Sequence, residues 1–237
     1  MLILGLDFET TGLSPQTDRV IEIGAVVWDT DSQKPKALFS ELVLPAPFSG
    51  LSPEIVKVTG IDDETLKTFG VDGNQAFERL QSLVKECDYI VAHNAAFDRG
   101  FYQQELLNYG MRDEYERPWI DTVLDVPYPE EIGTRKLTYL AAEHGFVNVY
   151  AHRAVFDTLT MLSILGQYPL DQVIARSQSP NVMVTSHVSF DEKDKAKNMG
   201  FRWDAPNKKW VKSMKLCDVE VTDFPFKYSV SEPELSL

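Results

Sequence analysis

The sequence contains few cysteines and no long hydrophobic segment. Of its 237 residues only two are cysteines, Cys87 and Cys217, and they lack metal-ligand spacing, so we expect neither a disulfide framework nor a zinc site. The apolar run at the N-terminus has no basic flank and is interrupted by Asp7 after six residues, which argues against a signal peptide or a membrane span. These absences predict a soluble, cytoplasmic protein.

Positive charge is also scarce, and it is unevenly distributed. The formal net charge of −13, from 23 Lys and Arg against 36 Asp and Glu, excludes a protein that coats nucleic acid through charge alone. Residues 1–180 carry a net charge of −13 (14 basic against 27 acidic), residues 181–215 carry +4 (8 against 4), and residues 216–237 carry −4 (1 against 5). An acidic body of this kind is typical of proteins in which bound cations neutralise some carboxylates.

The pattern of apolar residues predicts an α/β domain. Three segments rich in β-branched and aliphatic residues, 2–7, 19–29 and 38–44, come first and are separated by short turn-forming clusters. Helical and strand patterns then alternate, which indicates a mixed sheet flanked by helices. Two further strands are expected at 89–94 and 119–123, and helices at 53–58, 63–68, 74–85, 95–110, 136–144 and 154–165.

A polar segment that ends in proline, residues 175–180, is expected to link two domains. The preceding residues, 1–174, form the α/β domain, and residues 181–237 are predicted to form a small β-rich module. The module interleaves basic and aromatic side chains, a combination that can hold phosphates and stack unpaired bases. The alternative is a small domain whose two tryptophans form its own core and whose lysines are solvated. The side chains concerned are Lys195, Lys197, Phe201, Arg202, Trp203, Lys208, Lys209, Trp210 and Lys212.

Acidic side chains recur at three points of the first domain. Asp7 and Glu9 end the first expected strand two residues apart, so they share one face of the sheet and can bind one cation together. Asp98 lies in the first turn of the helix that follows the expected strand at 89–94, where an acid also meets the helix dipole favourably. His152 and Asp157 are five residues apart, which is about 140° on a continuous helix, so we expect His152 on the preceding loop and Asp157 on the helix.

Three segments together resemble the motifs of the DEDDh 3'-5' exonucleases, the DnaQ-like family with a ribonuclease H-like fold. They are DFETTG (7–12), HNAAFD (93–98) and HRAVFD (152–157), in the family's order, and the family's strand VIEIGAV follows the first of them. The resemblance covers about residues 1–168. It implies a mixed five-stranded sheet and an enzyme that hydrolyses phosphodiester bonds from the 3' end of DNA, releasing nucleoside 5'-monophosphates.

The resemblance also assigns a role to each motif residue. Asp7, Glu9, Asp98 and Asp157 would hold two Mg²⁺ or Mn²⁺ ions, as a two-metal mechanism requires. His152 would accept the proton of the attacking water near neutral pH. The terminal nucleotide would lie against the remaining residues of the first two motifs. The expected substrate-binding residues are Thr10, Thr11, Gly12, Leu13, His93 and Asn94.

Other interpretations stay open at this point. An exoribonuclease of the same family would carry the same motifs. A catalytically idle nucleic-acid-binding or polymerase-associated subunit would have no chemical need for all five catalytic residues. A metal-binding structural protein is not favoured, because calcium-type acidic loops are absent. The extra module favours a free-standing role in DNA repair, recombination or phage DNA metabolism, in a bacterium or a phage-infected cell. Asp121, a strand-end acid, is expected to be structural.

Overall fold

The computed structural model describes residues 1–129 and 131–231, and the chain divides into two compact units. The first unit is Met1–Ile174, and the second begins at Ala175. Across the described ranges, no helix combines the length and the apolar character needed to cross a lipid bilayer.

The segment expected to be a linker is partly helical. Helix α7 (Leu170–Gln178) includes residues 175–178, and Ser179 and Pro180 then lead into the first strand of the second unit. A proline ends a helix and disfavours helical backbone in the residue before it, here Ser179, so the helix can extend to Gln178. The polar side chains of this segment therefore lie on a helix that has only Val173 fully buried.

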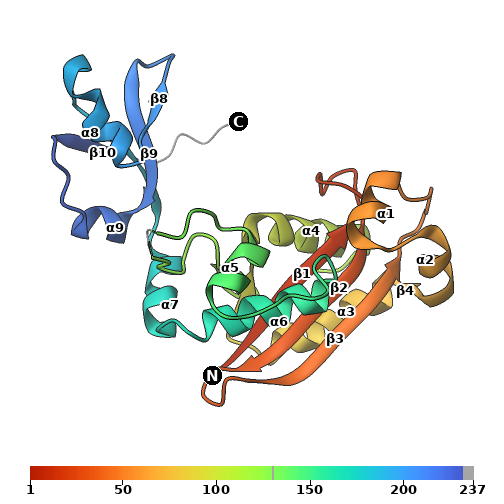
Figure 1. The fold of residues 1–237 in the computed structure, drawn as a ribbon. Helices are drawn as coiled ribbons and strands as arrows, with labels where there is room; N and C mark the ends of the chain where they lie inside the picture. Colours follow the sequence, from red (N-terminus) through yellow and green to blue (C-terminus); the bar gives the residue numbers. More distant parts are fainter. Residues whose placement is uncertain (130, 232–237) are drawn as a thin grey trace. The chain divides into compact units, whose positions relative to one another are not determined.

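The first unit is built on a mixed six-stranded sheet (Figure 1). Strands β1, β2 and β3 pair antiparallel, whereas β5 and β6 run parallel to β1, and β4 runs parallel to β3. This arrangement confirms the predicted α/β fold. In sheet order the strands are β4 (Val71–Asp72), β3 (Lys34–Leu44), β2 (Val20–Asp29), β1 (Leu2–Thr10), β5 (Tyr89–Ala92) and β6 (Trp119–Asp121).

The sheet has one strand more than the five that were expected. The additional strand, β4, consists of Val71 and Asp72, which pair in parallel with Val43 and Leu44 at the end of β3. A two-residue strand shows no alternation of apolar and polar side chains, so its sequence pattern could not reveal it.

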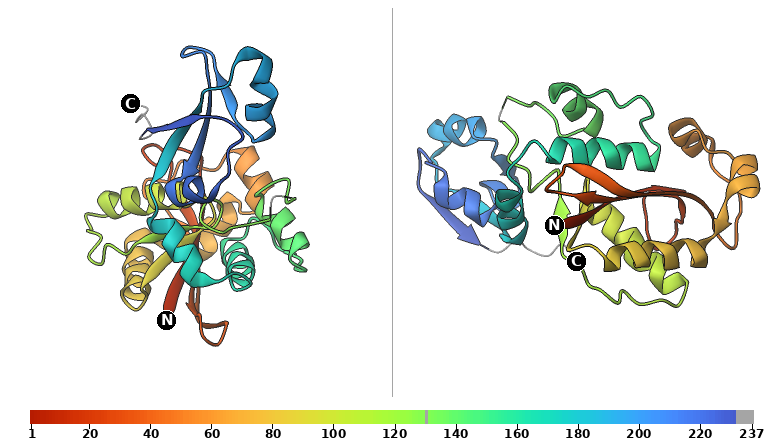
Figure 2. Two further views of the ribbon diagram at one scale, coloured as in Figure 1. Left: turned by 90° about the vertical axis from the view of Figure 1, so that its left-hand side faces the viewer. Right: turned by 90° about the horizontal axis from the view of Figure 1, so that it is seen from below.

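Helices cover both faces of this sheet (Figure 2). Helices α3 and α4 form one apolar core with β1 and β2, while α5 and α6 form a second core on the opposite face. Each helix lies within a few residues of its expected range. The helices are α1 (Pro53–Thr59), α2 (Asp63–Phe69), α3 (Gly73–Lys85), α4 (Ala95–Asn108), α5 (Leu137–Glu143) and α6 (Ala154–Leu165).

Strand β1 separates the two cores because its side chains alternate between the faces of the sheet. Leu4, Leu6 and Phe8 are buried in the core with α3 and α4, whereas Ile3 is buried in the core with α6. The odd-numbered side chains thus face α6. Where the apolar sequence of β1 ends, the same face carries carboxylates instead of aliphatic groups.

Helix α6 approaches the sheet closely at Gly24 of β2. A Cβ atom at this position would lie 2.1 Å from the carbonyl carbon of Ala154 and 2.2 Å from the amide nitrogen of Val155. Thr158 strengthens the contact, because its hydroxyl donates a hydrogen bond to the Gly24 carbonyl oxygen at 3.0 Å. The glycine of the VIEIGAV segment therefore sets the depth at which the start of α6 lies on the sheet.

The second unit contains a four-stranded antiparallel sheet with two short helices, as the predicted β-rich module requires. Its small core contains Val182, Val184, Ala196, Phe201 and Val219. In chain order the elements are β7 (Asn181–Ser186), α8 (Lys193–Asn198), β8 (Arg202–Asp204), β9 (Lys209–Lys215), α9 (Leu216–Val221) and β10 (Tyr228–Ser231), with a 3-10 turn at Phe190–Glu192.

Candidate active site

The two acids of the first motif lie at the C-terminal end of β1, on the face that α6 covers (Figure 1). Asp7 pairs with Gly24 of β2 and Glu9 pairs with Glu22, so both acids are neighbours of the strand on which α6 rests. Both side chains are half-buried. The predicted sharing of one face by Asp7 and Glu9 follows directly from the regular strand geometry between them.

Asp98 reaches the same strand end from α4. It lies in the first turn of this helix, only 2% of its surface is exposed, and its Oδ1 accepts a hydrogen bond from the Phe8 amide at 3.1 Å. Because Phe8 stands between Asp7 and Glu9 in the strand, this bond holds the Asp98 carboxylate beside both acids.

The third motif brings His152 and Asp157 to the site from the start of α6. His152 lies on the loop before the helix with φ of 65°, and its backbone amide donates to Asp157 Oδ2 at 3.0 Å. Asn148 donates a side-chain hydrogen bond to Asp157 Oδ1. Glu9, His152 and Asp157 each offer a ligand atom, and these atoms lie within 4.8 Å of one another. The predicted loop position of His152 and helical position of Asp157 agree with this geometry.

An ion pair between the buried Glu22 and the partly exposed Arg153 anchors the residues that follow His152. Glu22 of β2 is fully buried, and both of its oxygens accept hydrogen bonds from Arg153 Nε at 3.0 and 3.2 Å. Arg153 Nη2 donates to Glu22 Oε1 at 2.8 Å, and the Ala154 amide donates to Oε2 at 3.1 Å. This bidentate pair joins β2 to the first turn of α6, between His152 and Asp157.

Burial and neighbouring acids raise the pKa values of Asp7 and Glu9. Burial raises the pKa of Asp7 well above its ordinary value, and the charges of Asp98 and Glu9 raise it further. Burial, followed by the charges of Asp157 and Glu22, raises the pKa of Glu9 to about 8, and Arg153 opposes this only in part. A site of this kind is deficient in positive charge, and a bound cation would stabilise its ionised form.

Burial also raises the pKa values of the other two carboxylates, Asp98 and Asp157, but hydrogen bonds that stabilise their charged forms oppose this effect. Burial raises the pKa of Asp98, while the Phe8 amide lowers it. Burial raises the pKa of Asp157, while Asn148 and the His152 amide lower it. Hydrogen bonds to these two acids therefore position them as well as moderating their repulsion.

The loop after β1 places the expected nucleotide-binding residues beside the acids. Thr10 is buried and its hydroxyl donates to the Gly12 carbonyl oxygen at 2.5 Å, while Thr11 Oγ1 donates to Asp18 at 3.3 Å. A Cβ atom at Gly12 would lie 2.5 Å from the Asp18 carboxylate, so a glycine fits there. Leu13, which follows, is 85% exposed. The loop thus presents one apolar side chain to solvent next to a charged site.

His93 and Asn94 differ in their freedom to reach a substrate. The ring nitrogens of His93 lie 2.9 Å from Thr122 Oγ1 and 2.7 Å from the Arg135 carbonyl oxygen, so a substrate contact would have to replace one of these bonds. Asn94 is exposed at the start of α4. Asp121 accepts hydrogen bonds from the backbone amides of Asn94 at 3.1 Å and Val123 at 2.8 Å, a structural role.

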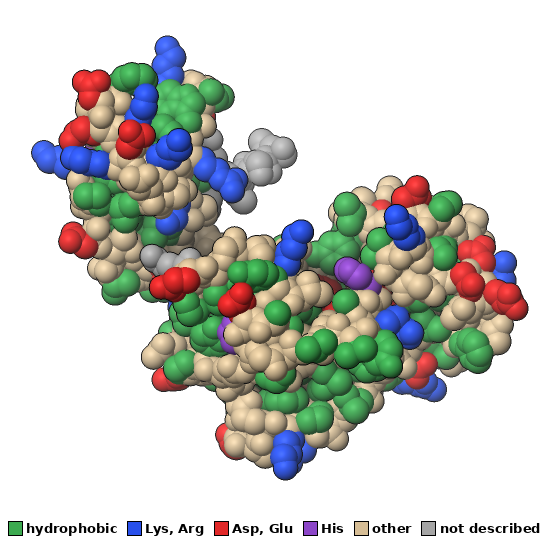
Figure 3. Space-filling model, in the orientation of Figure 1, with side chains coloured by type: hydrophobic (Ala, Val, Ile, Leu, Met, Phe, Trp, Pro, Cys, Tyr) green, Lys and Arg blue, Asp and Glu red, His purple; other side chains and the backbone are tan. Residues whose placement is uncertain are grey.

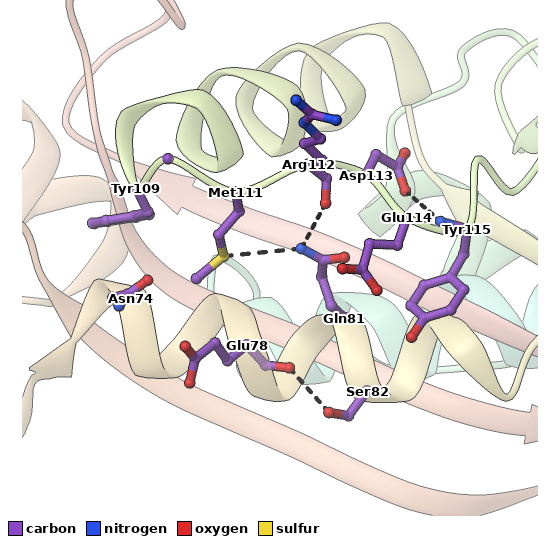
Figure 4. A pocket seen from close by; sticks show the side chains of 11 residues that line it. Asn74, Glu78, Gln81, Ser82, Tyr109, Met111, Arg112, Asp113, Glu114 and Tyr115 are labelled. Atoms are coloured by element: carbon purple, nitrogen blue, oxygen red, sulfur yellow. Dashed lines mark hydrogen bonds between the residues drawn. The ribbon is translucent and has the colours of Figure 1, made fainter.

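A separate cavity of about 960 Å³ lies between α3 and residues 109–115 (Figure 4). Gln81 crosses it and donates to the Arg112 carbonyl oxygen at 3.0 Å. Glu78 and Glu114 also line the cavity, which disfavours a phosphate there, and none of the predicted catalytic residues does.

The pattern of motifs did not identify three residues that shape the site, namely Glu22, Arg153 and Asn148. A charged residue within the apolar run VIEIGAV was the available signal for Glu22, because a buried acid in a strand needs a partner. The same reasoning points to a basic partner without naming Arg153. Asn148 lies in a loop, and nothing local distinguishes it from other polar loop residues.

Comparison with known proteins agrees with this geometry. Residues 4–165 match the family described as Exonuclease (RNase_T), and residues 182–228 match one described as a domain of unknown function (DUF8626). The chain is 33% identical over 156 residues to DNA polymerase III PolC-type of Pediococcus pentosaceus, covering 65% of this chain. It is 34% identical over 152 residues to the protein of the same name from Thermotoga maritima. The chain spans 10% and 11% of the lengths of these relatives.

Solved structures show the same fold. The zinc-bound complex of E. coli ExoI with single-stranded DNA has a TM-score of 0.65 and 18% identity, covering 78% of this chain and 48% of that one. The nuclease domain of 3'hExo, a DEDDh family member bound to rAMP, has a TM-score of 0.60 and 18% identity, covering 70% of this chain and 90% of that one. With the matched family and the three motifs, these findings show that the chain belongs to the DnaQ-like exonuclease family with a ribonuclease H-like fold.

Proposed function

We propose that this chain is a metal-dependent 3'-5' exonuclease that hydrolyses phosphodiester bonds from the 3' end of DNA and releases nucleoside 5'-monophosphates. The observation that carries the proposal is the convergence of acids from β1, α4 and α6 with His152, in a member of an exonuclease family. The four acids come from three separate motifs, so the cluster is not a local accident of one acidic segment.

The donor set fits divalent cations. Asp7, Glu9, Asp98 and Asp157 offer only oxygen ligands, which Mg²⁺ and Mn²⁺ prefer. Burial raises the pKa values of all four acids, and the charges of neighbouring acids raise those of Asp7 and Glu9 further, so bound cations would stabilise the ionised forms. Two such ions held by these residues would supply the positive charge that stabilises the attacking and leaving oxygens of phosphodiester hydrolysis.

His152 is proposed as the base that removes the proton of the attacking water. Its side chain lies within 4.8 Å of Glu9 and Asp157 ligand atoms, and the Asp157 carboxylate fixes its backbone through the amide. Its side chain is exposed, so the proton that it accepts can pass to bulk water before the next cycle. The Glu22–Arg153 pair fixes the residues that follow His152 in the chain and so orients this base.

Binding of the terminal nucleotide is assigned to the loop after β1 and to Asn94. Leu13 offers an exposed apolar surface to a base, and Thr10, Thr11 and Gly12 form the wall beside it. Neutral groups at this point leave room for the negative phosphate, which the acidic cluster alone would repel.

DNA is favoured over RNA by what the similar proteins are. The two relatives are DNA polymerases by name, and the ExoI structure holds single-stranded DNA. The 3'hExo domain holds rAMP, which supports an exoribonuclease as the second candidate.

The decisive experiment is digestion of 5'-labelled single-stranded DNA, duplex DNA and RNA by the full chain, with Mg²⁺, with Mn²⁺ and with chelator. We expect a metal-dependent ladder that shortens from the 3' end, with DNA cut faster than RNA and nucleoside 5'-monophosphates as products. Faster cleavage of RNA would replace DNA by RNA as the substrate. No degradation of any polymer would refute the proposal.

A further inference from the structure

The second unit carries an open cavity of about 400 Å³ whose walls combine aromatic rings and lysines. This volume lies within the range of sites that hold small molecules or parts of larger ones. Figure 3 shows apolar side chains with Lys and Arg side chains around them on the visible face of this unit. The residues that line this aromatic-lysine cavity are Phe190, Lys193, Asp194, Lys197, Trp203 and Trp210.

Two of the three aromatic side chains that line the cavity, Phe190 and Trp203, lie outside the core of the unit. Trp203 is 51% exposed and Phe190 is 79% exposed, and neither packs into the apolar core around Phe201. Trp210 lies directly opposite Trp203 in the β8–β9 pair, with ring centroids 5.6 Å apart, and does pack against that core. Trp210 therefore holds Trp203 in place. Trp203 exposes a large apolar surface whose burial would otherwise be favourable.

Two lysines and one acid, Asp194, line the cavity, so its lining carries a net positive charge. Lys193 and Lys197 are four residues apart on α8 and so lie on the same side of it. Neither forms an ion pair with any residue that the structure describes, and Lys193 Nζ lies 4.0 Å from the centroid of the Phe190 ring.

Two neighbouring lysines are used differently. Lys195 pairs with Glu192 at 2.6 Å, and Lys212 donates to the Met199 carbonyl oxygen at 2.8 Å. Lys195 and Lys212 thus make contacts within the unit, whereas Lys193 and Lys197 face the cavity.

We propose that the aromatic-lysine cavity binds an unpaired base of single-stranded DNA, with the base against Trp203 and Phe190 and the flanking phosphates at Lys193 and Lys197. Rings and cations together match a strand whose bases are exposed between anionic phosphates. A duplex would satisfy the lysines but would leave the rings without a partner, because its bases are already stacked. The choice of nucleic acid as the ligand rests on the proposed nuclease function of the first unit.

This site would offset the charge of the nuclease unit. A strand held at the cavity stays tethered to the same chain, so its end encounters the active site at a raised effective concentration. An acidic unit that repels DNA at long range gains most from such a tether.

Direct binding tests the proposal without relying on catalysis. The affinity of the full chain for fluorescein-labelled oligothymidylate is measured by anisotropy in EDTA, which removes metal. Trp203→Ala is expected to weaken binding by about 5-fold to 100-fold, whereas Trp203→Phe, which retains a ring, keeps most of the affinity. The double variant Lys193→Gln, Lys197→Gln is expected to weaken binding and to reduce the dependence of log K on log salt by about 1.4.

A matched control removes the same charge elsewhere on the unit. Lys208 and Lys227 are exposed and do not line the cavity, so Lys208→Gln with Lys227→Gln is expected to retain the wild-type affinity. Circular dichroism and thermal unfolding establish that each variant is folded. An oligonucleotide of abasic sites is expected to bind wild type and Trp203→Ala equally weakly.

The outcomes separate this inference from the proposed nuclease function. If folded Trp203→Ala binds as tightly as wild type while the chain digests DNA, the cavity proposal fails and the nuclease proposal stands. If the chain binds single-stranded DNA through Trp203 but digests no polymer, the nuclease proposal fails and the cavity proposal stands. Tighter binding of the matching RNA overturns the assignment to DNA, and Trp203-dependent self-association in sedimentation would make a second copy the occupant.

Discussion

The two units present opposite kinds of surface at the sites that we propose for nucleic acid. The first buries or half-buries acids that repel one another, and it holds them through hydrogen bonds such as that from the Phe8 amide to Asp98. The second leaves Phe190 and Trp203 exposed beside lysines without ion pairs. Stability is reduced in both units, by charge repulsion in one and by exposed apolar surface in the other. Departures from the most stable arrangement are thus found where we place chemistry and binding.

The largest expected effect separates catalysis from binding. Asp157→Asn should reduce the hydrolysis rate by more than the about 100-fold typical of losing an outer-shell partner, because Asp157 is proposed as a direct metal ligand. Binding of oligothymidylate in EDTA should not weaken, since the second unit is unchanged. Parallel rate and anisotropy measurements check this. If the substitution weakened both equally, the division of labour between the units would be wrong.

The proposed base should show a smaller and more selective loss. His152→Gln is expected to lower kcat by about 100-fold to 10,000-fold, the usual contribution of a positioned general base, with KM little changed. The metal titration should keep its midpoint, because the four acids are intact. Single-turnover kinetics at several metal concentrations measure both quantities, and a shifted midpoint would mean that His152 serves as a metal ligand instead.

Breaking the Glu22–Arg153 ion pair tests whether the activity of the first unit depends on the orientation of His152 as well as on the charge of the acids. Arg153→Gln leaves the buried Glu22 carboxylate with the Ala154 amide as its remaining partner. Breaking a fully buried ion pair typically costs about 3 to 5 kcal/mol, and a smaller loss of stability is expected here because the Arg153 side chain is 43% exposed. The double variant Glu22→Gln, Arg153→Gln should regain most of this stability but not the activity, since the bidentate contact is lost. Thermal unfolding and kcat are compared for the single and double variants. Full activity in the stable double variant would show that the pair serves folding alone.

The smallest effect concerns pH. The folded pKa of Glu9 is about 8, above its ordinary value of 4.5, so between these pH values the unfolded chain loses this proton first. Metal-free protein should therefore lose stability as pH rises through this window, and Glu9→Gln should reduce the loss. Melting curves in EDTA from pH 5 to 8 give the comparison. A change of about 1 kcal/mol in the free energy of unfolding shifts the melting temperature by about 2 to 4 °C. Mg²⁺ should stabilise wild type more at pH 8 than at pH 5, and equal stabilisation would contradict this account.

The sequence predicted those parts of the site that depend on local geometry. Strand alternation places Asp7 and Glu9 on one face, and helix geometry separates His152 from Asp157, so both relations could be read from spacing. The resemblance to a known family supplied the roles of these residues.

What could not be predicted depends on distant contacts or on very short elements. Glu22 and Arg153 are 131 residues apart, and only the folded sheet brings them together. The two residues of β4 carry no pattern, and the division of the lysines depends on where Glu192 and Met199 lie. Similarly, the bonds of His93 to Thr122 and Arg135 require the completed fold.

The hydrogen bond between Asp98 and the Phe8 amide also links enzymatic competence to correct folding. A slip of β1 by one residue would turn Asp7 and Glu9 to the opposite face and bring Phe8 into the position of an acid. The carboxylates therefore come together only after the strand register and the start of α4 are both correct. The proposed nuclease would thus acquire its complete set of acids only in the folded state, and a partly folded chain would lack it.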